Sequence, residues 1–159
     1  MDPLADFAAS VEATAFVKAL KFSRWGYSLA NAAHVFGIAL LVGSILPLDL
    51  RLLGVWKSVD RTALTRVLFP VAATGLVIAI AAGLILFSVR AQHYVKVDLF
   101  WWKLSLISTG AALALLFHAR AGVYVERAGP QQAAFHGAAS LVCWVGALLC
   151  GRLIAYFPG

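Results

Sequence analysis

Two histidines stand at matching places in consecutive apolar runs. His118 follows Phe117 near the end of one run, and His136 follows Phe135 near the start of the next. If the runs are antiparallel helices, each histidine lies roughly 13 Å from its helix centre, on the same side of the membrane. Two imidazoles at one depth on adjacent helices supply the axial ligands of a b-type haem. The pattern predicts metal ligation by His118 and His136, and interfacial hydrogen bonding is the alternative.

Small residues share a helix face with each of these histidines. Gly110 and Ala114 precede His118 at fourfold spacing, and Ser140 follows one turn after the next histidine. On the haem interpretation they leave room for the porphyrin plane, and Arg120 pairs with a propionate. A tight helix seam explains the same stripe equally well, because small residues mark helix contacts in membranes.

The other two histidines differ in depth. His34 lies near the middle of the first apolar run, where an ionisable residue is costly and by default functional. We expect it to contact a cofactor or a quinone head or to relay protons, and a hydrogen bond to Asn31 or across the bundle is the alternative. His93 lies beyond the second run, roughly 18 Å away in depth. It is predicted to be a loop residue, and this pair is a poor match for a second haem.

The cysteines offer a third kind of site. Cys143 and Cys150 are seven residues apart, roughly 10 Å along a helix, which is too far for a disulfide. A copper site formed by Cys143 with His118 and His136 suits the softness of the ligands. Its weakness is that Cys143 lies roughly 10 Å deeper than His136.

Composition identifies the environment that must hold these residues. The chain of 159 residues is 62% hydrophobic and 13% charged, and its mean hydropathy is +0.88. Soluble domains carry about 25% charge. The thirteen Lys and Arg are scattered between apolar runs without a basic stripe, so a nucleic-acid partner is excluded and the lipid bilayer is expected.

The apolar runs predict an all-α integral membrane protein, an antiparallel four-helix bundle that forms one domain over 1–159. A short amphipathic helix on the membrane surface is expected within residues 1–22. Each run is long enough to cross a hydrocarbon core, which needs about 20 residues. The predicted spans are 25–48, 67–89, 99–119 and 131–156.

Residues at the ends and faces of the runs add detail. Pro47 and Asp49 are predicted to mark the exit of the first span, with Asp49 and Arg51 as an interfacial ion pair. No Asp or Glu then falls inside a span, which disfavours proton-coupled transport. Gly75 and Gly83, with Ala79 between them, form a small-residue ridge in the second span that favours close helix contact.

Four spans put both termini on one side of the membrane. Lys and Arg are shared almost evenly between the two sides, so they do not fix the direction of insertion. Cytoplasmic termini are expected because no export signal is recognisable.

Three motifs resemble an uncharacterised family of small four-span bacterial membrane proteins: Trp25 and Tyr27 ahead of Ala33-His34, the run from Asp49 to Gly54, and the ending from Gly151 to Tyr156. This resemblance implies a bacterial inner membrane. The architecture also resembles small four-helix b-type cytochromes, in which histidines on two helices at equal depth hold each haem. That resemblance implies haem b at His118 and His136.

The function expected from these observations is a membrane haem-b electron carrier that exchanges electrons with quinone or with a redox partner protein. A non-enzymatic accessory or small-solute membrane protein is the alternative from another class, and the copper site is the third.

Overall fold

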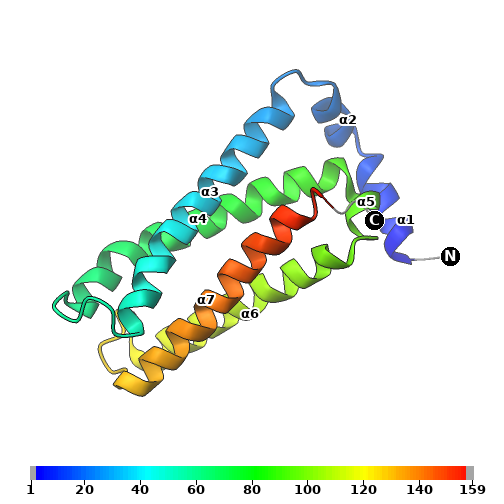
Figure 1. The fold of residues 1–159 in the computed structure, drawn as a ribbon. Helices are drawn as coiled ribbons and strands as arrows, with labels where there is room; N and C mark the ends of the chain where they lie inside the picture. Colours follow the sequence, from blue (N-terminus) through cyan, green and yellow to red (C-terminus); the bar gives the residue numbers. More distant parts are fainter. Residues whose placement is uncertain (1–2, 157–159) are drawn as a thin grey trace.

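Within residues 3–156, which the computed structural model describes, the chain folds into seven helices and no strand (Figure 1). They are α1 (Pro3–Glu12), α2 (Ala15–Phe22), α3 (Gly26–Leu52), α4 (Arg61–Val89), α5 (Ala91–Tyr94), α6 (Asp98–Ala121) and α7 (Pro130–Leu153).

The four long helices, α3, α4, α6 and α7, are each long and apolar enough to cross a membrane. The all-α four-helix bundle predicted from the sequence is therefore confirmed. Residues 157–159 lie outside the described part, and α7 ends at Leu153 rather than at Tyr156.

The exit predicted for the first span is wrong, because α3 continues through Pro47 to Leu52. A proline inside a helix removes one backbone hydrogen bond. Ending the helix there would instead leave several carbonyls without partners, and unpaired backbone groups are costly in lipid. The continuation puts Asp49 inside the helix, so the expectation that the spans hold no carboxylate is also wrong.

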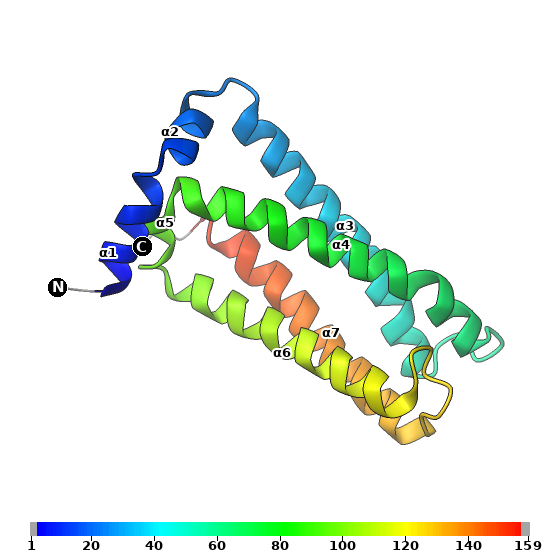
Figure 2. The same ribbon diagram turned by 180° about the vertical axis from the view of Figure 1, so that it is seen from behind.

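The helices pack in the order α4, α3, α7, α6. The α3–α4 and α6–α7 hairpins each pack internally, and α3 joins them by packing on α7. In the part of the chain that the structure describes, α4 and α6 do not pack extensively on each other. Figures 1 and 2 show the helices gathered at the end with the α3–α4 and α6–α7 loops and spread apart towards α1, α2 and α5, where α3 diverges from α4. The C-terminal end of α7 lies at the same end of the bundle as α1, as four spans require.

The closest helix crossing joins α3 and α4 at Gly37 and Gly75. A Cβ added at Gly37 would lie 2.5 Å from the Ala79 nitrogen and 2.8 Å from the Gly75 carbonyl oxygen. A Cβ added at Gly75 would lie 2.6 Å from the Leu41 nitrogen. The two backbones touch directly, so the small-residue ridge predicted on the second span has its expected role at Gly75.

Glycine also sets the contacts of α7. Gly137 lies against the last turns of α3, where an added Cβ would be 2.8 Å from the Asp49 carbonyl oxygen. Gly110 of α6 lies against Cys143 and Trp144, at 3.1 and 3.2 Å from an added Cβ. Both glycines let neighbouring helices approach closely.

The N-terminal segment forms two short helices rather than one. Thr14 lies between the two helices and caps the N-terminus of α2, where its hydroxyl accepts a hydrogen bond from the Val17 N–H. Glu12 ties the segment to the bundle, because its carboxylate accepts from the Gln92 N–H at 2.9 Å and pairs with Lys21 at 3.1 Å. The hydrogen bond from Gln92 has the largest effect on the pKa of Glu12, and together with the contacts to Lys21 it holds that pKa below its usual value.

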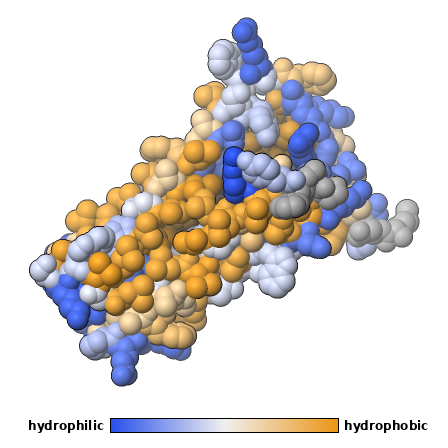
Figure 3. All heavy atoms as spheres, viewed as in Figure 1, coloured by the Kyte–Doolittle hydropathy of each residue, from blue (hydrophilic) through white to orange (hydrophobic). Residues whose placement is uncertain are grey.

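The surface has the pattern of a membrane protein. Figure 3 shows a broad apolar band across the middle of this face of the molecule, with hydrophilic residues gathered towards its two ends. Large apolar side chains of the long helices, such as Leu115, Val142 and Val77, are mostly exposed. Such an extensive exposed apolar surface fits contact with a lipid bilayer.

Candidate functional site

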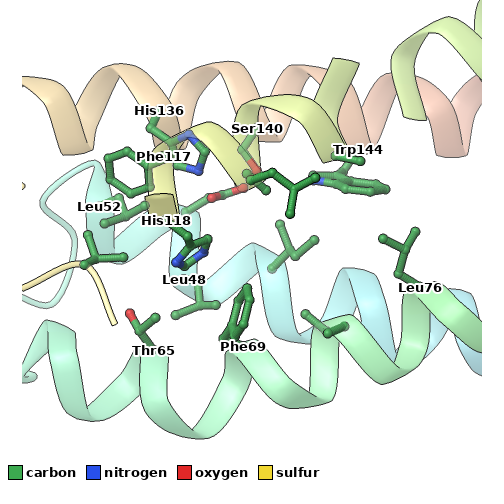
Figure 4. A pocket seen from close by; sticks show the side chains of 18 of the residues that line it. Leu48, Leu52, Thr65, Phe69, Leu76, Phe117, His118, His136, Ser140 and Trp144 are labelled. Atoms are coloured by element: carbon green, nitrogen blue, oxygen red, sulfur yellow. The ribbon is translucent and has the colours of Figure 1, made fainter. Parts of the chain in front are cut away.

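A pocket of about 240 Å³ lies among all four long helices, in the converging half of the bundle (Figure 4). Its wall is mainly apolar, with side chains such as Leu48, Leu76 and Phe69. A few residues with polar groups interrupt this wall: Asp49, Thr65, His118, His136, Ser140 and Trp144. A mainly apolar hollow with few polar groups is the usual form of a small-molecule site.

Asp49 is the most unusual residue of this pocket. It is only 3% exposed, and its Oδ2 atom has no hydrogen-bond partner within residues 3–156. The Ser140 hydroxyl on α7 interacts with the carboxyl group. A buried carboxyl oxygen without a partner is costly to keep. This cost suggests that the group serves a bound molecule.

The predicted ion pair between Asp49 and Arg51 is wrong. The Arg51 guanidinium donates instead to the carbonyl oxygens of Val59 and Lys57, at 2.6 and 3.2 Å. The two residues are two positions apart on α3, so their side chains leave the helix on different sides. Arg51 stabilises the α3–α4 loop, and Asp49 is buried in the pocket.

His118 is held by the loop that follows its helix. Its Nδ1 atom lies 2.8 Å from the Val123 carbonyl oxygen. Because a carbonyl only accepts, Nδ1 carries the proton and Nε2 is an acceptor in the neutral ring. The Phe69 ring of α4 packs on the imidazole with the ring centroids 4.3 Å apart.

His136 reaches the same pocket from α7. Its ring stacks on Phe117, with the centroids 3.9 Å apart and the planes inclined by 11°. No hydrogen bond to its ring nitrogens is present among residues 3–156. The structure thus brings His118 and His136 to one pocket, as their matched depth predicted.

The pocket reaches the lipid-facing surface. Ala73 of α4 and Leu115 of α6 both line it and are both exposed, Leu115 by 73%. These are the two helices that do not pack extensively on each other. The wall of the pocket between α4 and α6 therefore includes side chains that are also exposed on the outside of the bundle.

The structure does not bring His34 to this pocket. Its Nδ1 donates to the Ala79 carbonyl oxygen at 2.7 Å and links α3 to α4. Gly83 makes room for the ring, because an added Cβ would lie 3.1 Å from the His34 Cε1. The geometry supports the alternative role, a hydrogen bond across the bundle. His93 lies in α5, at the opposite end of the bundle.

The remaining predicted site residues separate into two groups. Ala114 and Ser140 line the pocket. Gly110 does not, because it faces Cys143 and Trp144 at the α6–α7 contact, and Arg120 is exposed at the end of α6.

The cysteines also lie outside the pocket lining. Cys143 and Cys150 are both free thiols, as their spacing predicted. Within residues 3–156, no three His, Cys, Asp or Glu side chains are grouped so that they would hold a metal ion.

Sequence reasoning missed four residues that shape the pocket: Asp49, Thr65, Phe69 and Trp144. Of these, only Asp49 could have been predicted from the sequence. An acidic residue shortly after a proline in an apolar run lies either in a loop or inside a helix that continues past the proline, and the second possibility would have placed Asp49 within the span. The others are identified only by the packing of the hairpins.

Comparison with known proteins gives no assignment. No family model matches the chain, and neither a curated protein nor a solved structure matches it.

Proposed function

We propose that this protein binds a lipid-soluble hydroquinone-type molecule in the pocket among α3, α4, α6 and α7. The observation that carries the proposal is the Asp49 carboxyl oxygen, which is buried without a partner among the described residues, in a mainly apolar pocket whose wall includes the exposed Ala73 and Leu115.

The acceptors in the pocket favour a ligand with hydrogen-bond donors. The Asp49 carboxyl group offers an acceptor oxygen in either protonation state, and neutral His118 offers Nε2, since its Nδ1 already donates to Val123. A hydroquinone ring carries two hydroxyl donors on an apolar frame. The corresponding quinone carries two acceptors in their place, so the reduced form fits these groups better.

The size of the pocket favours a single ring. A cavity of about 150 Å³ is known to take benzene, so about 240 Å³ is enough for a substituted ring. An apolar tail on that ring would leave between Ala73 and Leu115 into the lipid.

Filling the pocket is expected to abolish binding. Ala114→Phe adds a large ring to the pocket wall, whereas Ala112→Phe adds the same ring on the exposed face of α6. We expect a decyl-benzohydroquinone to raise the thermal unfolding temperature of the wild type and of Ala112→Phe in detergent, and to leave that of Ala114→Phe unchanged.

The oxidised decyl-benzoquinone is the chemical control for this titration. We expect it to stabilise the wild type less than the reduced form does. Equal stabilisation of Ala114→Phe and Ala112→Phe by the hydroquinone would contradict this site.

The haem-b electron carrier is the second candidate, and the pairing of His118 and His136 in one pocket favours it. The Nδ1 bond of His118 to a backbone carbonyl is the orientation that metal-bound imidazoles use. The residues as arranged do not fit a haem, because the pocket of about 240 Å³ is below the roughly 300–1,000 Å³ of larger ligand sites.

Absorption spectra distinguish the two candidates. A bis-histidine haem is expected to give a red protein with a sharp α-band on reduction, lost in His118→Ala and in His136→Ala but kept in His93→Ala. Colourless protein after expression with ample haem would rule out the haem-b electron carrier and would not affect the hydroquinone proposal. Under both candidate functions we also propose that the protein lies in a bacterial inner membrane and that it has a redox partner protein.

A further inference from the structure

A second hollow, of about 480 Å³, lies at the converging end of the bundle, outside the pocket described above. It is bounded by the end of α3, the α3–α4 loop, the start of α4 and the first turn of α7. Three cationic residues, Arg51, Lys57 and Arg61, line it together with Gln131, and no carboxylate from residues 3–156 does.

The two arginines are fixed in place by backbone carbonyls. Arg51 donates to Val59 and Lys57 in the α3–α4 loop, and Arg61 donates to Ala128 at 2.9 Å across to the α6–α7 loop. These bonds use two of the five N–H donors of Arg51 and one of those of Arg61. Most donors of both guanidinium groups stay available to a ligand.

The positive charges of this hollow are not neutralised by the described part of the protein. Within residues 3–156, the ion pair between Lys21 and Glu12 is the only salt bridge, and it lies at the other end of the molecule. The Asp60 carboxylate adjoins Arg61 in sequence, but it caps α4 by accepting from the Ala63 N–H at 2.6 Å, does not line the hollow and forms no ion pair within residues 3–156. A cluster of three cations that forms no ion pair within residues 3–156 favours an anion with several acceptor oxygens.

We propose that this hollow binds a phosphate group, carried either by an anionic lipid headgroup or by a free phosphate. Its position supports the choice, because it lies where α3 ends and α7 begins, which is where headgroups meet a spanning bundle. The site is independent of the hydroquinone pocket, which shares only Leu52 with it.

The test compares Lys57→Gln with Arg127→Gln in detergent-purified full-length protein. Both changes remove one positive charge at the same end of the molecule, but Arg127 does not line the hollow. The Lys57 side chain makes no hydrogen bond within residues 3–156, so its loss leaves the loop contacts intact. The thermal unfolding temperature is followed during titration with inorganic phosphate, and separately with mixed micelles containing phosphatidylglycerol or phosphatidylcholine.

We expect saturable stabilisation by phosphatidylglycerol, by inorganic phosphate or by both, but not by phosphatidylcholine. The apparent dissociation constant should rise about tenfold in Lys57→Gln and stay unchanged in Arg127→Gln. Stabilisation by phosphatidylglycerol alone assigns the source to the bilayer, and stabilisation by inorganic phosphate alone assigns it to a soluble anion. No saturable effect of either, or equal weakening in both variants, would overturn the proposal.

Gln131→Glu gives an independent measure, since it places a negative charge in the hollow on an exposed residue of α7. We expect it to abolish the stabilisation. Unchanged stabilisation in this variant would also overturn the proposal.

Discussion

Replacing Gly37 by valine is expected to destabilise the bundle severely, because it forces α3 away from α4. The first added carbon would already lie 2.5 Å from the Ala79 nitrogen and 2.8 Å from the Gly75 oxygen. Both are backbone atoms, so no side chain can move aside and the two helices must separate. Overpacking of a fixed contact costs about 1–3 kcal/mol, and more where backbone must shift. We expect a loss above about 3 kcal/mol.

Gly43→Val is the matched control for this change, because Gly43 lies on the same helix and an added Cβ meets nothing within 4 Å. Thermal unfolding in detergent should show a large drop for Gly37→Val and little change for Gly43→Val. Separation of α3 from α4 should also weaken the bond from His34 to Ala79. Similar unfolding temperatures for the two variants would contradict the close crossing.

Asp49→Leu is expected to stabilise the fold while weakening ligand binding. The Asp49 carboxyl is 3% exposed and one of its oxygens lacks a partner among the described residues. Replacing such a group by an apolar side chain relieves a burial cost of about 1–3 kcal/mol. Its loss would leave a hydroxyl of the bound hydroquinone without a partner, at a cost of about 1–3 kcal/mol, so affinity for the hydroquinone should fall about tenfold.

Asp98→Leu provides the comparison for this result. Asp98 is the exposed first residue of α6, where a negative charge is favourable at a helix N-terminus. Its loss should lower the unfolding temperature slightly and leave hydroquinone affinity unchanged. A fall in the unfolding temperature of Asp49→Leu would show that the carboxyl stabilises the fold and has no need of a ligand.

The sequence predicted those features that depend only on the type of a residue and on its position along one helix. Uninterrupted apolar runs predicted the four long helices, and matched depth predicted that His118 and His136 meet. The spacing of Gly75 and Ala79 predicted a close contact on the second span, which Gly37 completes. Each of these inferences depends on periodicity along one helix.

The rest depended on contacts between distant segments. The burial of Asp49 requires α7 to pack on the last turns of α3, which Gly137 permits. The partner of His34 is the carbonyl of Ala79, and a backbone carbonyl has no signature in the sequence. A titratable residue in an apolar run therefore indicates that a partner is needed, but it does not identify that partner.

The arrangement of the pocket between two hairpins bears on how the protein assembles during synthesis. Each hairpin has its own close contacts, Gly37 with Gly75 in one and Gly110 with Trp144 in the other, so each can form as the ribosome delivers it to the membrane. The pocket exists only after the second hairpin has joined the first through α3 and α7. A molecule bound in the pocket would stabilise the association of the two hairpins. If the chain is divided between α5 and α6, the two fragments should therefore reassemble more completely in its presence.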